Sequence, residues 1–309
     1  MRTHQLIPTP DTVTQTFDRK TPPALTIDPG DTVAVRSLDA WGHLEPQTVP
    51  GEVKAQMFPE RLGHCLTGPI AVRGAMPGDM LAVNFVSFTP DSWGWTAAGR
   101  RSDAFTRALG VEPGVPQWLL WQLDAVRQTG TNDLGQSIKL SPFLGVVGVP
   151  PQRPGSFSTT PPRADGGGNI DCRELVAGST LFLPVTVPEA MLCVGDGHAA
   201  QGDGEVGGTA IECGMESRII VDLVADPALP SVHAITPTAR ITFGFNPDLN
   251  AATAEALKAM LTWMQALYGM ERTSALALAS SVVDLRITQI ANETWGVHAV
   301  LGHSAISQA

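Results

Sequence analysis

The sequence predicts a mainly β protein that ends in a smaller α+β unit. Its 309 residues include 31 glycines and 25 prolines, while only 16% are charged, a balance typical of many short strands joined by tight turns. A pattern of apolar strand, Pro-Gly-Asp turn and apolar strand occurs twice, over 25–37 and over 70–86. Because proline followed by glycine favours a chain reversal, each copy is expected to be a hairpin of a duplicated β module.

The middle of the chain departs from simple strand patterns in two places. Four tryptophans between residues 93 and 121 alternate with cations such as Arg100 and Arg101, which fits either the aromatic wall of a pocket or ordinary core packing. Proline-rich residues 150–162 then predict a long irregular loop, which ends in three glycines, 166–168, before Asn169 and Asp171. Since glycine lets a backbone approach a ligand closely, Asn169 and Asp171 are interpreted as site residues.

Helices are expected only near the C-terminal end. Residues 248–268 carry apolar side chains at helical spacing, and Gly269 follows at the position of a C-cap. A second helix is predicted over 271–283, and strands over 284–290 and 296–301 complete the unit. Pro227 and Pro230 interrupt the pattern before it. We therefore divide the chain into a β-rich region, residues 1–230, which carries the site, and a C-terminal α+β unit, residues 231–309.

Composition excludes several classes of partner. The formal net charge of −10 argues against binding to nucleic acid or to an anionic membrane, because both are polyanions. No apolar run reaches 18 residues and no apolar signal segment follows the first residues, so neither a membrane helix nor a signal peptide is expected. Four cysteines stand in apolar contexts without CxxC spacing, as buried reduced thiols do. We expect a soluble, cytoplasmic protein with a small neutral substrate.

The densest group of chemically active side chains lies between Asp196 and Glu205. It also contains His198, Gln201 and Asp203, set among glycines and flanked by apolar runs. Gly-Asp-Gly segments are common in hairpin turns, so a purely structural turn is one interpretation. Carboxylates held between buried strands, however, tend to be paired, hydrogen-bonded or metal-bound. We therefore interpret this segment as a catalytic loop.

The residue types favour metal-assisted hydrolysis over nucleophilic catalysis. Neither a Gly-x-Ser-x-Gly elbow nor a Ser-x-x-Lys motif is present, and the cysteines stand in apolar surroundings. Aspartate, glutamate and histidine near the two glycine-rich segments provide enough ligands for a divalent ion and a general base. An acidic loop of this kind also suits a closed calcium site in a binding module without turnover. That module is the competing class of function.

Several motifs, taken together, resemble the acetamidase/formamidase family over nearly the full chain. They are Thr67-Gly68-Pro69-Ile70, Gly167-Gly168-Asn169-Ile170-Asp171, the run from Leu175 to Leu181, the run from Gly195 to Glu205, and Asp284-Leu285-Arg286-Ile287-Thr288-Gln289. The resemblance implies hydrolysis of short linear amides to a carboxylate and ammonia, or opening of γ-lactams as in related members. It also implies a jelly-roll-like sandwich with a small β-barrel and a C-terminal α+β unit, a divalent metal with zinc favoured over calcium, and a homo-oligomer, expected to be a dimer.

With this resemblance, each site residue receives an expected role. The metal ligands are Asp171, Asp196 and His198, the catalytic residues are Glu205, Asp203 and Asn169, and the substrate-binding residues are Gly168, Gln201 and Trp95. Glu205 is the first choice for the general base, because collapse of a tetrahedral intermediate must protonate the leaving nitrogen. It is also the alternative to Asp196 as a metal ligand. His43 and His64 are further site residues to consider, although a lone histidine beside apolar residues is more often part of the core.

Overall fold

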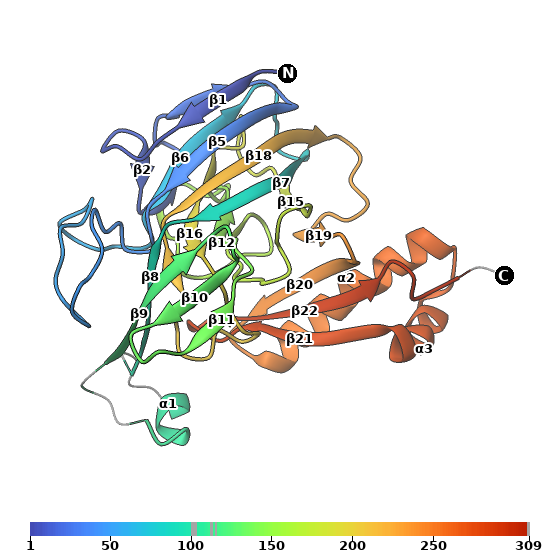
Figure 1. The fold of residues 1–309 in the computed structure, drawn as a ribbon. Helices are drawn as coiled ribbons and strands as arrows, with labels where there is room; N and C mark the ends of the chain where they lie inside the picture. The colour runs from blue at the N-terminus through green and yellow to red at the C-terminus, as the bar shows by residue number, and fades with distance from the viewer. Residues whose placement is uncertain (100–103, 112–113, 115, 308–309) are drawn as a thin grey trace.

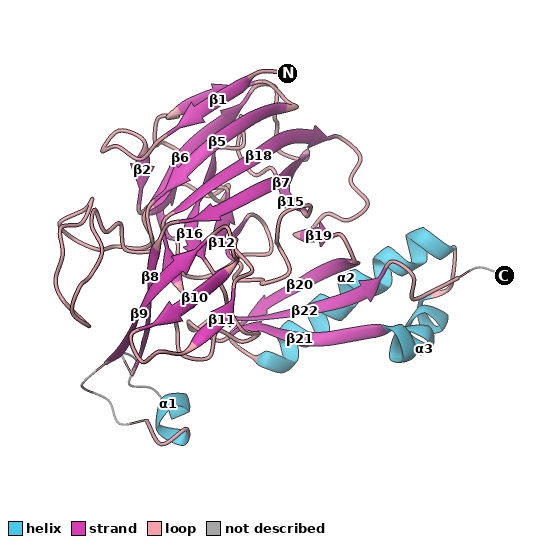
Figure 2. Cartoon of the chain, viewed as in Figure 1, coloured by secondary structure: helices cyan, strands magenta, loops and turns pink. Residues whose placement is uncertain are grey.

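The computed structural model describes residues 1–99, 104–111, 114 and 116–307. Most of the regular structure in these residues is strand, and the mainly β fold class is confirmed (Figures 1 and 2). Three helices occur: α1 (Ala104–Ala108), α2 (Leu249–Tyr268) and α3 (Arg272–Val282). Arg100 and Arg101, which the sequence analysis placed among the tryptophans, lie outside the described residues.

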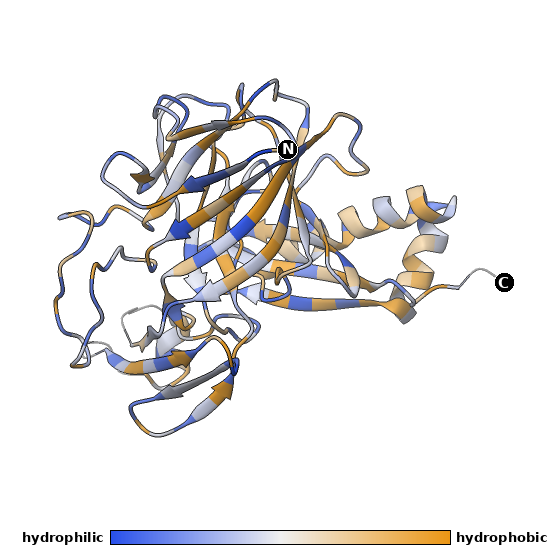
Figure 3. Ribbon diagram, turned by 45° about the horizontal axis from the view of Figure 1, so that its top comes forward, coloured by the Kyte–Doolittle hydropathy of each residue, from blue (hydrophilic) through white to orange (hydrophobic). Residues whose placement is uncertain are grey.

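A nine-stranded sheet runs the length of the molecule. In order across the sheet, its strands are β1 (Thr3–Leu6), β5 (Asp31–Ser37), β18 (Met215–Val224), β7 (Met80–Pro90), β15 (Thr180–Pro184), β19 (His233–Ile235), β20 (Ala239–Asn246), β22 (Trp295–Gly302) and β21 (Val283–Gln289). β1 pairs with β5 in parallel, and the other neighbours are antiparallel. Apolar and polar residues interleave along the long strands, as a sheet with one face on a core requires (Figure 3).

A second sheet of eleven strands carries most of the site. Its main path is β11 (Ser137–Lys139), β10 (Thr129–Asn132), β9 (Gln117–Asp124), β8 (Trp93–Ala98), β17 (Glu212–Cys213), β16 (Leu192–His198), β12 (Phe143–Gly148) and β14 (Gly167–Asn169). β6 (Leu66–Val72) also pairs with β16, and β2 (Val13–Thr14) and β4 (Leu25–Ile27) pair with β6. A separate two-stranded sheet joins β3 (Thr16–Asp18) to β13 (Ser156–Ser158), so the proline-rich loop contains one short strand.

The main hydrophobic core joins the two large sheets. It contains Val33 of β5 and Ile219 of β18 from the first sheet, together with Val147 of β12 and Val194 of β16 from the second. Along β5, buried and half-buried residues alternate, which is the period-2 pattern of a strand with one face on a core. β12 and β16 are buried at every position, because they are covered on both faces.

The two Pro-Gly-Asp turns do not close hairpins. The first connects β4 of the eleven-stranded sheet to β5 of the nine-stranded sheet, and the second connects β6 to β7 in the same way. The duplicated pattern therefore marks two equivalent crossings between sheets. The prediction of hairpins was wrong because a tight turn fixes only the local reversal, while the partner of each strand is chosen by burial of its apolar faces.

Part of the expected catalytic loop is a strand. β16 continues through His198, and the irregular segment begins only at Ala199. A Cβ on Gly195 would lie 2.9 Å from the Cys65 carbonyl oxygen, and one on Gly197 would lie 2.7 Å from that of Cys213. These glycines are therefore required by the close approach of neighbouring strands, rather than by a turn.

The C-terminal helices pack on one face of β20, β22 and β21. Asp248 caps α2 by accepting a hydrogen bond from the Ala251 N–H at 2.8 Å, and Gly269 ends it in the left-handed conformation with φ 65°. Both helices match their predicted ranges to within one residue at each end. β19 continues the sheet from β15, so the sheet runs across the boundary expected near residue 230, which stays a prediction. None of the described helices is long and apolar enough to cross a membrane.

Candidate functional site

Four buried acidic residues and one buried histidine meet at the centre of the eleven-stranded sheet. Asp196 and His198 belong to β16, Glu212 belongs to β17, and Asp171 lies two residues after the end of β14. Glu205 lies in the segment between β16 and β17. Because β16 is hydrogen-bonded to both β12 and β17, and β12 to β14, strand pairing alone brings these distant parts of the chain together.

His198 is held in one orientation by Gln201. Its Nδ1–H donates to Gln201 Oε1 at 2.9 Å, and Gln201 Nε2 donates to the Asp171 carbonyl oxygen at 2.7 Å. His198 Nε2 therefore faces two carboxylates, Asp196 Oδ2 at 3.4 Å and Glu212 Oε2 at 3.3 Å. Gln201, expected to bind substrate, serves here as the residue that orients the imidazole.

The cluster contains an unusual number of buried polar atoms without a hydrogen-bond partner. Within the described residues they are Asn169 Oδ1, Asp171 Oδ1 and Oδ2, Asp196 Oδ1, His198 Nε2, Glu205 Oε2 and Glu212 Oε2. Buried polar atoms are normally satisfied, and a convergence of unpaired oxygens and one imidazole nitrogen is an arrangement that a bound cation would satisfy. Ligand atoms of Asp171, His198 and Glu205 lie within 4.8 Å of one another, as do those of Asp196, His198 and Glu212. This donor set fits a divalent metal ion.

Gly145 of β12 leaves the space in which these carboxylates meet. A Cβ at this position would lie 2.5 Å from Asp196 Oδ2, 2.6 Å from Asp171 Oδ1 and 2.8 Å from His198 Cε1. Any side chain would therefore displace the three groups. The sequence analysis missed Gly145, because a single glycine in an apolar strand carries no signal of its own.

Burial controls the protonation of the cluster. It raises the pKa of Glu205 to about 7 and that of Glu212 to about 8. Burial and the charge of Glu205 also raise the pKa of Asp171 well above its usual value. Burial opposes ionisation of Asp196 too, but the electrostatic influence of His64 and His198, with hydrogen bonds to His198 and Glu212, holds its pKa below the usual range. Burial would lower the pKa of His198, yet the charges of Glu212 and Asp196 outweigh it and raise that pKa well above normal.

A cavity of about 100 Å³ gives access to the cluster. Asn169, Asp196, Glu205 and Glu212 line it, and Trp95 forms part of its wall. A second cavity of about 190 Å³ is lined in part by residues shared with the first, among them Trp41, His64 and Thr160, and by Arg61. The Arg61 guanidinium lies over the Trp41 ring, 4.2 Å from its centroid. Both cavities are smaller than the roughly 300–1,000 Å³ of most ligand pockets.

Hydrogen bonds hold the aromatic wall in place. Trp95 Nε1 donates to Asp39 Oδ2 at 2.6 Å, and His43 Nδ1 donates to the same oxygen at 2.6 Å. Trp41 packs against Trp95 with ring centroids 4.3 Å apart. His43 thus supports the wall from behind, whereas His64 lines the cavity with its Nε2 3.9 Å from Asp196 Oδ2.

Two of the expected site residues lie apart from both the buried cluster and the cavity lining. Asp203 is exposed, and its pKa is raised by burial of part of the carboxyl and by the charge of Glu174, a residue outside the cluster. Gly168 is buried in β14, where φ is +107° and a Cβ would meet the Phe17 ring at 3.5 Å. Glu212 was missed, although a glutamate between the apolar Ile211 and Cys213 is itself a signal of a buried charge.

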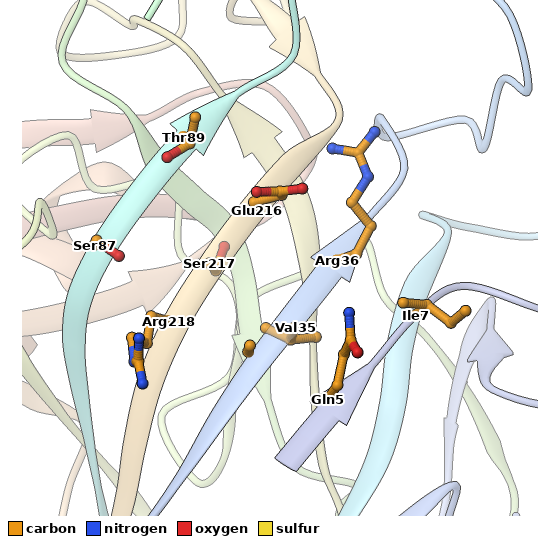
Figure 4. A pocket seen from close by; sticks show the side chains of 10 residues that line it. Gln5, Ile7, Val35, Arg36, Ser87, Thr89, Glu216, Ser217 and Arg218 are labelled. Atoms are coloured by element: carbon orange, nitrogen blue, oxygen red, sulfur yellow. The ribbon is translucent and has the colours of Figure 1, made fainter. Parts of the chain in front are cut away.

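A larger cavity lies elsewhere, on the outer face of the nine-stranded sheet. It measures about 490 Å³ and is lined by side chains of β1, β5, β7 and β18, including Gln5, Ser87 and Glu216 (Figure 4). Its lining residue Arg36 is paired with Asp91 at 2.6 Å, and Glu216 is exposed. The buried carboxyl groups of Asp196, Glu205 and Glu212 line the smaller cavity instead.

Comparisons with known proteins agree with the motifs. A model described as the acetamidase/formamidase family matches residues 4–158 and 153–237. The crystal structure of an acetamidase from Bacillus halodurans is 26% identical and covers 96% of this chain and 97% of that chain, with a TM-score of 0.86. The crystal structure of an acetamidase from Yersinia enterocolitica is 28% identical and covers 99% of this chain and 93% of that chain, with a TM-score of 0.87.

A formamidase from Methylophilus methylotrophus is 26% identical over 58% of this chain, and the match spans only 56% of that enzyme's length. The resemblance predicted from the motifs is confirmed by these matches. The predicted enzyme class, a hydrolase of carbon–nitrogen bonds in linear amides, is confirmed with it.

Proposed function

The chain belongs to the acetamidase/formamidase family, and we propose that it hydrolyses a small linear amide of the formamide or acetamide type to a carboxylate and ammonia. The observation that carries the proposal is the arrangement at the smaller cavity. Glu205, Asp196 and Glu212 line a space of about 100 Å³ together with Asn169. A pocket of this size favours a substrate of a few heavy atoms, because most ligand pockets measure roughly 300–1,000 Å³.

A divalent ion, zinc by preference, is part of this proposal. His198 with Asp171 and Asp196 would hold it, and Glu212 lies as close to His198 Nε2 as Asp196 does. When bound, such an ion polarises a carbonyl oxygen and lowers the pKa of its water to about 7. Binding would displace the proton that the surrounding carboxylates otherwise hold on His198. The unpaired oxygens of the cluster support the assignment.

Glu205 is proposed as the general base and proton shuttle. Its carboxyl lines the cavity, and burial raises its pKa to about 7, so it can exchange a proton near neutral pH. It takes a proton from the attacking water and returns it to the leaving nitrogen when the tetrahedral intermediate collapses. Asn169 Oδ1 is buried and unpaired at the same cavity, where it can accept a hydrogen bond from the substrate amide N–H.

The test measures ammonia release from formamide, acetamide and propionamide by the purified full chain. Glu205→Gln keeps the shape of the side chain and removes the base, so we expect kcat to fall about 100-fold or more. Glu216→Gln, on the outer face of the sheet, is the matched control and should keep wild-type activity. A Glu205→Gln variant with full activity would remove the assignment of the base.

Metal content is measured on the same samples, before and after treatment with a chelator and re-addition of zinc. If turnover is lost when the chelator removes zinc and recovers when zinc is bound again, the result supports a role of the metal in catalysis. If the protein opens the ring of a γ-lactam but releases no ammonia from the linear amides, its substrate is a cyclic amide and not a linear one. If zinc or calcium binds and neither reaction occurs, the protein is a binding module and the proposal is wrong.

We further propose a cytoplasmic homodimer with no nucleic-acid or membrane partner. The formal net charge of −10 supports the exclusion of polyanionic partners. Light scattering coupled to size-exclusion chromatography measures the mass of the assembly, and twice the chain mass of 32.6 kDa is the expected result.

A further inference from the structure

A second group of metal-binding side chains lies beside the catalytic cluster and takes no part in it. Cys172 and Glu174 follow Asp171 directly in the chain, and His298 stands on β22 of the other sheet (Figure 1). One ligand atom from each of Cys172, Glu174 and His298 lies within 4.8 Å of the other two. Cys172 and His298 are both 0% exposed.

Two of the three distances between the ligand atoms are close to those around a tetrahedral metal, and the third, between Cys172 Sγ and His298 Nε2, is at most 4.8 Å. Glu174 Oε2 lies 3.3 Å from Cys172 Sγ and 3.1 Å from His298 Nε2. Zinc takes ligands at about 2.0–2.3 Å, and at tetrahedral angles such ligands stand about 3.3–3.6 Å apart. One ion can therefore contact all three atoms with only small shifts.

His298 is oriented as a metal-ligating imidazole is. Its Nδ1 is hydrogen-bonded to Thr288 Oγ1 at 2.8 Å, which leaves Nε2 as the nitrogen that faces Cys172 and Glu174. That Nε2 is buried and has no hydrogen-bond partner among the described residues, although Glu174 is close. Ligating histidines typically have such a partner on their other nitrogen, because it fixes the ring and the tautomer.

The neighbouring Arg286 determines which oxygen of Glu174 is free. Arg286 contacts Glu174 Oε1 at 2.5 Å, so that Oε2 is the oxygen left for an ion. Arg286 and His298 face each other as register partners on β21 and β22. Asp203, which the catalytic cluster leaves out, is electrostatically coupled to Glu174 and His298 and stands on the solvent side.

We propose that Cys172, Glu174 and His298 form a second divalent-cation site, separate from the catalytic cluster and selective for zinc through its thiolate. Thiolate and imidazole together favour zinc over calcium or magnesium. Binding would displace the proton of the Cys172 thiol, because a metal takes the thiolate.

The site would tie the C-terminal strands to the catalytic segments. Gly204 N–H donates to the Thr288 carbonyl oxygen at 3.0 Å, and Ile290 N–H donates to the Gly204 carbonyl oxygen at 2.8 Å. An ion held by Cys172 and His298 adds a further link between the chain next to Asp171 and β22. Its role is therefore structural, and it stabilises the segment that carries Glu205.

Cobalt(II) substitution tests the site without any assay of activity. A thiolate bound to cobalt gives an intense charge-transfer absorption in the near ultraviolet, whereas a site of carboxylates and imidazole does not. The full chain is stripped of metal, titrated with CoCl₂ and compared with Cys172→Ser and with Cys193→Ala. Cys193 is also buried, but its Sγ lies next to a carbonyl oxygen, 3.9 Å from that of Met191.

We expect the band in the wild type and in Cys193→Ala, its loss in Cys172→Ser, and one fewer zinc per chain in Cys172→Ser after reconstitution. His298→Gln should also remove the band or shift it, which keeps the test valid if Cys172→Ser folds poorly. The proposal is overturned if the wild type lacks the band or if the band survives in Cys172→Ser. In that case Cys172, Glu174 and His298 are only a group of hydrogen-bonded side chains. Because no amide is involved, this outcome is independent of the proposed catalytic function.

Discussion

Gly145 shows how one absent side chain makes room for the chemistry of the site. A methyl group there would lie 2.5 Å from Asp196 Oδ2 and 2.6 Å from Asp171 Oδ1, both of which have little freedom to move because they are buried. We therefore expect Gly145→Ala to reduce kcat/KM for the best amide about 100-fold, since displacement of catalytic groups by about 1 Å can cost that much.

Gly202→Ala is the matched control for this change. Gly202 belongs to the glycine-rich run between Asp196 and Glu205, and a Cβ there meets no atom within 4 Å. It should keep wild-type activity and stability. Amide turnover and metal content are measured for both variants. Equal activity of the two would show that the space at Gly145 is irrelevant to catalysis.

Trp95 sets the size of the substrate in this arrangement. Its ring is fully buried in the wall of the cavity, and Asp39 anchors its N–H. Trp95→Phe shortens the wall, so we expect kcat/KM for propionamide to rise about 10-fold relative to formamide, the range in which one methylene changes specificity. Trp121→Phe, on the neighbouring strand β9 and away from the cavity lining, is the control. An unchanged ratio in Trp95→Phe would assign substrate size to other residues.

At the scale of single elements, the contact between α2 and β20 depends on Gly244. A Cβ on Gly244 would lie 1.9 Å from the Ala252 carbonyl oxygen and 2.7 Å from the Ala256 nitrogen. Both atoms belong to the helix backbone, which cannot give way without moving the whole helix. We expect Gly244→Ala to lower the free energy of unfolding by about 3 kcal/mol, at the upper end of overpacking costs.

Gly302→Ala on β22 is the comparison for Gly244→Ala, because the nearest atom to its Cβ would be 3.8 Å away. Its effect should stay within about 0.5 kcal/mol. Urea denaturation followed by circular dichroism gives both values. Similar stability of the two variants would mean that the helix shifts freely on the sheet.

Elements with local signals could be predicted from the sequence. α2 was located because Asp248 and Gly269 mark its ends and apolar residues recur at helical spacing between them. β16 was not, since Gly195 to His198 are buried on both faces and show no alternation. The hairpins were wrongly predicted for a different reason. Pairing between strands that are far apart in the sequence leaves no local signal in the sequence.

The same distinction applies to the site residues: those with a local sequence signal were predicted, and those placed by the fold were not. The density of acid and glycine in one stretch of chain identified Asp196, His198 and Glu205, which the structure brings to one cluster. Glu212 reaches that cluster only through the pairing of β17 with β16. Gly145 is missing from the prediction because its function is to leave space, and space depends on the fold.

At the scale of the whole molecule, the nine-stranded sheet joins the two regions that the sequence analysis separated near residue 230. His233 of β19 stands at this junction. Its ring stacks on Phe182 of β15 with centroids 4.6 Å apart, and it meets Trp263 of α2 edge-on at 5.0 Å. Its Nδ1–H donates to the Ser231 carbonyl oxygen at 2.8 Å. We infer that loss of this stack weakens both regions together.

The protonation of His233 makes that junction sensitive to pH. Burial lowers its pKa from 6.5 to about 4, so between these values the unfolded chain binds a proton that the folded chain does not. The free energy of unfolding should therefore be highest above pH 6.5 and fall by about 3 kcal/mol as the pH is lowered to 4.

Urea unfolding of the wild type and of His233→Gln at several pH values isolates this contribution, since all other groups titrate in both proteins. The variant should be less stable at pH 7 and lose less stability on acidification. Tryptophan fluorescence and circular dichroism should report one common transition, because the stack joins the two regions. Parallel pH profiles would contradict the role of His233, and two separate transitions would instead support independent folding on either side of residue 230.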